Sequence, residues 1–439
     1  MAQIRPFKGV RYSPSGSGDM AALISPPYDI ISPQQQEALY QASPYNFVRI
    51  EFNRELPQDS AEDNRYTRAA AFLTNWQKEG ILKQDETAAC YLHVHAFSCG
   101  GRRYLRQDII AAVKLEEWDS RIIRPHENII PRAKSDRMSM LYACRCNTSP
   151  ILAMYADPQK VISGLIAAQK KETPIMDFVD AWGEGHQVWA VNRPEVIRKL
   201  QNELAAQPLY IADGHHRYDS ALTLKREKSA QNPPSGGEEG WNYVMASLMD
   251  MADPGLIILP THRLVRGIAG GQLSGLKSRL EAFFDIQEIS LHSAEVWSRI
   301  DRSLSGLNPD AQQVSLAVIG LTENQVTLLT LKNISAVSNL MPAFHSELYK
   351  KLDVSLLDHI ILENLLGYNK DKEDILLAYT HDRSDALRRV SNQEYQMAFL
   401  LNPVGPAIVK GIADAGDRMP RKSTYFYPKA PAGLVFYKW

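Results

Sequence analysis

Five consecutive residues, Asp213-Gly214-His215-His216-Arg217, combine a carboxylate, a glycine, two imidazoles and a guanidinium. An apolar run precedes them and a helical pattern follows, so we expect a strand to end at Asp213 and a helix to begin near His215. Free backbone amides and the positive end of the helix dipole attract anions, and a glycine lets the ligand approach closely. The box therefore predicts a phosphate site.

Within this box, Gly214, His215, His216 and Arg217 are the expected phosphate ligands, because a guanidinium fork matches phosphate oxygens. Asp213 is the candidate ligand for Mg²⁺ or the residue that orients a histidine. Asp213 and His216 are the candidate catalytic groups of the box. Two ordinary explanations stay open, since an Asp-Gly pair before a helix is a common N-cap and paired histidines also occur on protein surfaces.

A second group spans residues 124–137 and holds four cations, two carboxylates and a histidine within fourteen positions. Such a mixture in a loop or at a helix start suits a ligand with several negative charges, although charge runs are also common on solvated surfaces. The pair His126-Glu127 lacks the second histidine of a zinc-protease helix. The residues that we expect to bind anionic groups here are Arg132, Lys134 and Arg137.

A third group, residues 419–429, sets cations and hydroxyls among aromatic side chains. Lys422-Ser423-Thr424 is similar to the end of a P-loop, but the preceding glycines are absent, which excludes a Walker A motif. Lys422 and Ser423 remain candidates for phosphate binding and Tyr425 for substrate binding. Alternatively, the aromatic residues pin a terminal strand against the core.

His93 and His95 alternate along a predicted strand and therefore share one face of it. A metal pair is conceivable, but no further ligand stands nearby in the sequence, so we expect packing rather than metal binding. The four cysteines are too few for a disulfide framework. Cys144 and Cys146 form a C-x-C pair without a second thiol pair, and we expect them to be buried small hydrophobic residues.

The elements that must position these groups alternate between helix and strand. We expect a strand and turn before a helix near Gln34, a hairpin of strands 90–97 and 102–115, and a strand at 186–191 before a helix at 194–206. Residues 243–265 predict two buried strands joined as a hairpin at Asp253-Pro254-Gly255. The remainder predicts helices at 272–284 and 355–366, a hairpin at 314–332 and two strand–helix units. The fold class is therefore α/β (mixed α+β).

The composition limits the classes of protein and of function that fit this chain. The chain has 439 residues, of which 44% are hydrophobic and 23% charged, so a large core and two domains are expected. The net charge of -1 is not the excess of positive charge that is typical of nucleic-acid binders. No membrane span or export signal is visible in the sequence. We expect a cytoplasmic location. Residues 231–240 are the clearest Pro/Gly-rich break.

Five boxes carry a family resemblance: PPYDIIS, RPHENIIPRAKSDRM, IADGHHRYDSAL, ILPTHRLV and MPRKSTYFYPKAPAGLVF. Together they resemble the domain-of-unknown-function family numbered ten-fifteen over nearly the whole chain. The Asp-Gly-His-His-Arg box is similar to that of the ParB/sulfiredoxin-like superfamily. This resemblance implies a ParB-like phosphate- and nucleotide-binding domain with inserted elements over residues 1–265, and an α/β domain over residues 266–439 that closes the site.

Members of that superfamily similar to the free serine kinases transfer a phosphoryl group to free L-serine. The resemblance thus implies a small-molecule kinase with Mg²⁺ as cofactor and ATP, ADP or a polyphosphate-type donor as co-substrate. It also implies an acidic general base, for which Glu127 and Asp29 are the candidates. Asp29 and His126 are further candidates for substrate binding. A homodimer is possible, and neither a nucleic acid nor a membrane is an expected partner.

Two other function classes stay open. A nucleotide-binding regulatory or ParB-like partition protein would share the box, but the net charge and the lack of an evident helix-turn-helix disfavour DNA binding. DNA binding that weakens steeply as salt rises would support it. A phosphatase would use the same site to transfer a phosphoryl group to water. It would release phosphate from phosphoserine without a nucleotide acceptor.

Overall fold

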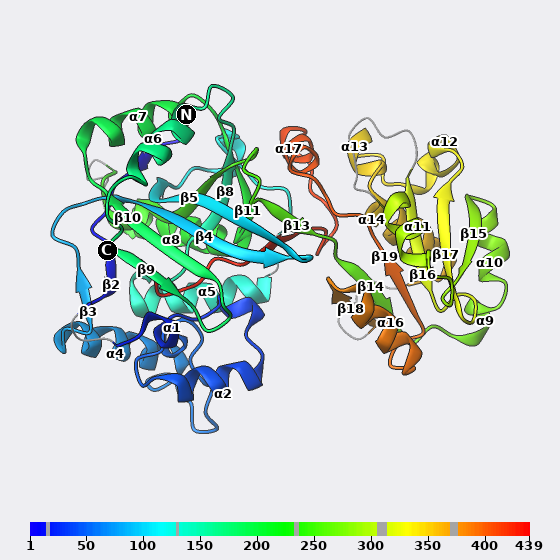
Figure 1. The fold of residues 1–439 in the computed structure, drawn as a ribbon, viewed down its shortest axis with the longest axis horizontal. Coiled ribbons are helices and arrows are strands. Elements are labelled where there is room, and N and C mark those ends of the chain that lie inside the picture. Colours follow the sequence, from blue (N-terminus) through cyan, green and yellow to red (C-terminus); the bar gives the residue numbers. More distant parts are fainter. Residues whose placement is uncertain (15–17, 129–130, 232–236, 305–313, 369–375) are drawn as a thin grey trace. The chain divides into compact units, whose positions relative to one another are not determined.

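The structure is a computed structural model that describes residues 1–14, 18–128, 131–231, 237–304, 314–368 and 376–439, without the side chains of residues 131–134. The chain divides into two compact units (Figure 1). The first contains Met1–Pro125, Ile129–Ile257 and Pro428–Trp439, and the second contains His126–Asn128 and Ile258–Tyr427. The polypeptide therefore passes between the units four times.

A nine-stranded mixed sheet forms the centre of the first unit (Figure 1). Its strand order is β6-β11-β8-β12-β5-β4-β10-β9, and β1 pairs with β5 in addition. β12 is parallel to β8 and β11 is parallel to β6, whereas β4 is antiparallel to both β5 and β10. The strands are β1 (Ile4–Arg5), β4 (Cys90–Cys99), β5 (Arg102–Lys114), β6 (Ile123–Arg124), β8 (Ile151–Tyr155), β9 (Met176–Val179), β10 (Gly185–Val191), β11 (Leu209–Asp213) and β12 (Tyr243–Asp250).

Helices cover both faces of this sheet, because its strands are apolar on both sides. Along β5, Ile109, Ala111 and Val113 enter one buried cluster, whereas Ile110 and Ala112 enter the other. This alternation is the period of two expected of a strand. The first cluster includes residues of α6, α7 and α8, and the second includes residues of α4 and the C-terminal segment. The fold is thus a layered α/β arrangement.

The other elements of the first unit are short or helical. The helices are α1 (Met20–Leu23), α2 (Pro33–Ala42), α3 (Val48–Glu51), α4 (Arg65–Lys78), α5 (Pro131–Cys144), α6 (Val161–Gln169), α7 (Pro194–Ala205) and α8 (His215–Gln231), with 3-10 turns η1 (Tyr28–Ile30), η2 (Trp118–Ser120) and η3 (Gly240–Asn242). Two small sheets pair β2 (Val10–Tyr12) with β3 (Leu82–Gln84), and β7 (Cys146–Asn147) with β21 (Tyr437–Lys438).

A six-stranded antiparallel sheet of order β15-β17-β16-β19-β14-β18 forms the second unit. Its strands are β14 (His262–Val265), β15 (Phe284–Ser290), β16 (Ser315–Ile319), β17 (Gln325–Leu331), β18 (Leu377–Thr380) and β19 (Met397–Leu400). β13 (Ile257–Leu259) pairs separately with β20 (Tyr425–Tyr427). The helices are α9 (Gly270–Leu273), α10 (Leu276–Glu281), α11 (Val296–Ser303), α12 (Ile334–Val337), η4 (Ser338–Leu340), α13 (Glu347–Lys350), α14 (Asp353–Leu356), the π-helix η5 (Leu357–Leu365), α16 (Arg383–Ser391) and α17 (Pro406–Asp414).

Many local predictions are confirmed. The hairpin of β4 and β5, the helices α2, α7 and α8, and the hairpin of β16 and β17 lie where the residue patterns placed them. The mixed α/β class is confirmed as well. Among the described residues, none of the helices combines the length and the apolar character needed to cross a bilayer.

Three predictions differ from the structure. The hairpin over residues 243–265 is wrong: every residue of β12 is buried, and β12 lies between β8 and β5 while β14 joins the sheet of the second unit. The predicted helix at 272–284 is interrupted, because Gly275 has a φ of 71° just before α10. The helix at 355–366 is mostly the π-helix η5, which follows α14.

The C-terminal residues also depart from the expected ranges. Residues 428–439 belong to the first unit, although the sequence placed all residues after 265 in a C-terminal domain. Phe436 is fully buried there and exchanges two backbone hydrogen bonds with Val10. The gain in buried apolar surface explains this return to the first unit.

Candidate functional site

The Asp213 box lies at the end of β11, as its residue types predict. β11 ends at Asp213, α8 begins at His215, and Gly214 between them has a φ of 90°. The pairing of β11 with β8 shifts register between Ile211 and Asp213, a bulge that re-aims the following residue. A Cβ on Gly214 would lie 2.9 Å from Ile151 Cγ2 and 3.0 Å from Arg217 Nε, so only glycine fits this turn.

Asp213 binds two cations. Arg217 Nη2 lies 2.7 Å from its Oδ2, and the Lys429 ammonium donates to its Oδ1. Lys429 Nζ also lies 3.8 Å from Asp29 Oδ2. Burial opposes the ionisation of Asp213, but Lys429 and Arg217 outweigh it and hold the pKa of the carboxyl well below its usual range. Asp213 is therefore an ionised carboxylate whose charge two cations share.

Arg217 extends this network to the residues just before β8, the strand that pairs with β11 at the bulge. Its Nη1 donates to Ser149 Oγ at 3.1 Å and to the Pro150 carbonyl. Ser149 Oγ in turn donates to Glu51 Oε1 at 3.0 Å. The guanidinium thus has protein oxygens as partners, and a phosphate at this turn would have to replace some of them.

Glu51 and Arg137 continue the network. Glu51 is fully buried, and Arg137 Nη1 lies 3.9 Å from its Oε1. Burial acts against the charge of Arg137, yet Glu51 and Asp136 raise its pKa. The guanidinium carbon of Arg137 lies 3.6 Å from the ring centroid of Tyr28, a cation–π geometry, and burial raises the pKa of Tyr28 to about 12.

The first unit therefore gathers several of the predicted site residues. Asp29, Arg137, Asp213 and Arg217 belong to one connected set of ion pairs and hydrogen bonds. His215 is buried and His216 is half-buried at the first turn of α8. A cavity of about 30 Å³, lined by Arg137, Ser149, Arg217 and their neighbours, adjoins the network. The side chains of Arg132 and Lys134 lie outside the described residues.

The remaining predicted residues lie in the second unit, where the second and third boxes meet. His126 Nε2 lies 3.1 Å from Thr424 Oγ1, and the Lys422 amide donates to Glu127 Oε1 at 3.4 Å. Ser423 is buried and donates to the Pro420 carbonyl, and the Tyr425 ring stacks on His381 with centroids 3.7 Å apart. The predicted set is thus divided between two units, each described by itself.

Four residues of the network were missed from the sequence: Tyr28, Glu51, Ser149 and Lys429. Lys429 belongs to the third box, but the P-loop-like run favours Lys422. Tyr28 stood in the PPYDIIS box beside Asp29. Glu51 and Ser149 carry no motif, and only their complete burial beside charged partners reveals them.

A second cavity, of about 270 Å³, lies within the second unit. Arg263, Arg418 and Arg421 line it together with Asp358 and Glu363. Arg263 is 1% exposed, donates to the Arg421 carbonyl at 2.9 Å and lies 3.4 Å from Asp358 Oδ1. The cavity offers partners to ligand groups of either charge.

The fold and the network define an α/β protein with a glycine turn between a strand and a helix, surrounded by buried ion pairs. The chain belongs to the family described as "Protein of unknown function (DUF1015)", whose model matches residues 4–355. The box at residues 419–436 lies beyond that match. No curated protein sequence matches the chain.

Solved structures give a distant likeness. A conserved hypothetical protein from Pyrococcus furiosus is 13% identical with a TM-score of 0.35, and the match covers 75% of this chain and 94% of that one. A free serine kinase in complex with AMP is 12% identical with a TM-score of 0.35, covering 74% and 92%. SbnI with a C-terminal truncation, from Staphylococcus aureus, is 10% identical with a TM-score of 0.35, covering 74% and 85%.

Proposed function

We propose that the first unit binds the phosphates of a nucleotide or similar donor at the Asp213 turn and transfers a phosphoryl group to a hydroxyl of a small molecule. The convergence of Asp213, Arg217, Lys429 and Asp29 at the start of α8 carries this proposal. Phosphoryl transfer depends on positioning and charge neutralisation, which cations and helix amides supply. Free L-serine is the first acceptor to test, because the box resembles that of the free serine kinases.

Binding at this turn requires an exchange of partners. Lys429 and Arg217 occupy both oxygens of Asp213, so a phosphate would take over the two cations while Mg²⁺ takes the carboxylate. The phosphate would free the carboxylate for Mg²⁺, and Mg²⁺ would free the two cations for the phosphate. Nucleotide and Mg²⁺ should therefore strengthen each other's binding by an equal factor, about 5–150-fold for a typical coupling. Calorimetric titrations of the nucleotide with and without Mg²⁺ measure that factor, and equal affinities in both would contradict the exchange.

We further propose that Asp29 accepts the proton of the acceptor hydroxyl. Its carboxylate is about a third exposed, with a side-chain exposure of 36%, and it lies in the same unit as Asp213, 3.8 Å from the shared Lys429 ammonium. Glu127 is the competing candidate for the general base. Asp29→Asn should then abolish turnover while retaining nucleotide binding, and loss of turnover in Glu127→Gln alone would favour Glu127.

The test of the activity uses the full chain with Mg²⁺, free L-serine and ATP, ADP or polyphosphate, and it detects phosphoserine by mass spectrometry. Arg217→Ala and Lys429→Ala should each lower kcat by about 10²–10³, the effect of removing one group that stabilises charge in a transition state. Arg193→Ala is the matched control, since Arg193 is 46% exposed and pairs at the surface with Glu172. The absence of turnover with every donor, together with no nucleotide binding, rejects the proposal.

A further inference from the structure

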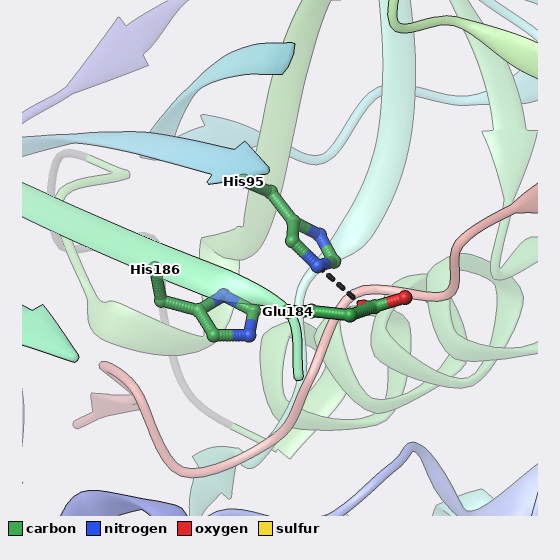
Figure 2. Close-up of side chains that lie close together, drawn as sticks. All are labelled: His95, Glu184 and His186. Carbon is green, nitrogen blue, oxygen red and sulfur yellow. Dashed lines mark hydrogen bonds and ion pairs between the residues drawn. The ribbon is translucent and has the colours of Figure 1, made fainter. Parts of the chain in front are cut away.

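Three side chains that suit a transition-metal ion lie together on the sheet of the first unit (Figure 2). His95 belongs to β4, His186 belongs to β10, and Glu184 directly precedes β10. One ring nitrogen of each histidine and one carboxylate oxygen of Glu184 all lie within 4.8 Å of one another. A zinc ion with bonds of about 2.0 Å holds its tetrahedral ligand atoms about 3.3 Å apart, so small side-chain shifts would close the site.

Strand pairing, rather than sequence proximity, creates this group. His95 and His186 are register partners in the antiparallel β4–β10 pair. Glu184 precedes His186 by two residues, which places it on the same side of the extended chain. The further ligands that are absent near His93 and His95 in the sequence are therefore supplied by β10 and the residue before it, about ninety residues later. Neither strand is at an edge of the sheet, since β4 lies between β5 and β10, and β10 lies between β4 and β9.

His186 and the neighbouring His93 each lie close to a carboxylate. His186 Nε2 lies 3.2 Å from Asp180 Oδ2, and its Nδ1 lies 3.1 Å from His93 Nε2. His93 Nδ1 lies 3.5 Å from Asp108 Oδ2. Metal-bound histidines usually donate their second ring N–H to a carboxylate, which fixes the tautomer and the ring orientation. With Asp180 accepting from Nε2, Nδ1 is the ring nitrogen of His186 without a carboxylate partner, and a metal ion bound there would displace its contact with His93.

The charges of the region leave room for a divalent cation. Asp108 pairs with the Arg106 guanidinium, whose Nε lies 3.5 Å from Asp108 Oδ2, whereas Glu184 and Asp180 lie against His95 and His186. The other ion-pair partners of these three carboxylates are histidines, which carry a charge only when protonated, and Asp108 and Arg106 are 1% and 2% exposed. Buried charges in proteins are paired or bind metals.

His95 supplies an independent observation. Its side chain is 1% exposed and its Nε2 lies 2.6 Å from Glu184 Oε2. Within the part of the chain that the structure describes, its Nδ1 has no hydrogen-bond partner. A fully buried imidazole that the protein leaves half-satisfied fits a ligand of a metal ion.

We infer that His95, Glu184 and His186 form a binding site for one divalent transition-metal ion, of which Zn²⁺ is the best match. Two imidazoles and a carboxylate suit Zn²⁺, whereas Mg²⁺ prefers oxygen ligands alone. The ion displaces the proton of any ligand atom that carries one, and that proton passes to solvent. Asp180 is a positioning residue for His186. The site uses no residue of the Asp213 turn, so it stands whether or not the proposed kinase activity is found.

The experiment uses the tag-free full chain, stripped with a chelator and titrated with Zn²⁺ against a chromophoric indicator. We expect about one ion per chain, bound more weakly as the pH falls because ligand protons compete. Glu184→Gln and His95→Gln should lose this binding, and Asp180→Asn should weaken it by about 10–100-fold. His292→Gln, which changes an exposed histidine, is the matched control and should bind as the unmodified protein does.

Circular dichroism establishes that each variant is folded. Co²⁺ spectra of the unmodified protein keep the test independent of the variants, because a site with imidazole ligands and low coordination number gives strong visible absorption and a site of oxygen ligands gives weak absorption. The inference is overturned if the unmodified chain binds no Zn²⁺, if its Co²⁺ spectrum is weak, or if folded Glu184→Gln and His95→Gln bind as tightly as the control.

Discussion

At the scale of single residues, the Asp213 box illustrates what residue type can and cannot predict. A strand end, a glycine and a helix start were predictable because local sequence determines them, and Gly214 indeed has a positive φ. The partners of Asp213 were not predictable, because Lys429 is more than two hundred residues away. The charge of a carboxylate at a turn is evident from the sequence, but the cations that neutralise it are fixed only by the fold.

Gly214→Ala should destabilise the first unit by about 1–3 kcal/mol. The residue has a φ of 90°, and the added Cβ would lie 2.9 Å from Ile151 Cγ2. Gly164→Ala is the control, because Gly164 lies inside helix α6 with no atom within 4 Å of the added Cβ. That change should stabilise by about 0.5–1 kcal/mol. Urea unfolding measures both, and effects of the same sign would contradict the argument.

Lys429→Met should cost about 3–5 kcal/mol near neutral pH, the usual effect of removing one partner from a buried ion pair. The pKa of Asp213 is lowered in the folded protein, so its share of stability is full above about pH 4 and is lost as the pH falls further. The pKa of Lys429 is raised, so its share is full below about pH 10 and is lost as the pH rises above that.

The difference in unfolding free energy between the unmodified protein and Lys429→Met should therefore be flat from about pH 5 to pH 9 and shrink at both extremes. Denaturant unfolding at a series of pH values measures this profile. A double variant with Asp213→Asn, which removes the unpaired carboxylate, should recover part of the loss. A difference that grows in acid would show that Lys429 and Asp213 do not stabilise each other.

At the scale of elements, hairpins and capped helices were predictable because their signals are local, as β4 with β5 and α2 show. The residue pattern predicts β12 as a buried strand but pairs it with the wrong neighbour. Its apolar residues on both faces are compatible with any central position in a sheet, so the sequence contains no preference for β8 and β5 over β14. The sequence likewise does not show which strand pairs with β4, so it does not predict that His95 lies beside His186.

Helix α2, which follows the Tyr28–Asp29 turn, depends on a capping box at Ser32. Ser32 Oγ accepts from the Gln35 amide at 3.2 Å, and Gln35 Oε1 accepts from the Ser32 amide at 2.9 Å. Ser32→Ala should cost about 1 kcal/mol, whereas Ser32→Gly should cost only a few tenths. Thermal unfolding of the two variants compares them, and an equal cost would argue that the cap contributes nothing.

At the scale of the whole molecule, the chain crosses repeatedly between two units. The stability of the first unit therefore depends on residues from distant parts of the sequence. Pro428–Trp439 lies in the first unit and contributes Phe436 to a core that also includes Val10, Phe47 and Tyr91. Composition could indicate two domains, but it could not indicate that the last residues return to the first. That return depends on burial between segments at opposite ends of the chain.

Phe436→Ala should destabilise the first unit by about 3–5 kcal/mol, because the side chain is fully buried and leaves a cavity. Phe344→Ala is the matched control, since Phe344 is 83% exposed and its loss should change the free energy of unfolding by no more than about 0.5 kcal/mol. Denaturant titration followed by tryptophan fluorescence gives both values. A small effect of Phe436→Ala would mean that the C-terminal segment is not part of the core.

The place of Lys429 in the chain also bears on how the protein is made. Asp213 and Arg217 leave the ribosome well before Lys429, because residues 258–427 are synthesised between them. During translation the first unit therefore lacks both a cation of its turn and an edge of its core until the whole second unit has been produced. A product that stops before Lys429 retains the motif residues of the box without the complete set of charges around them, so the synthesis of Lys429, rather than that of the motif, determines when the turn is assembled.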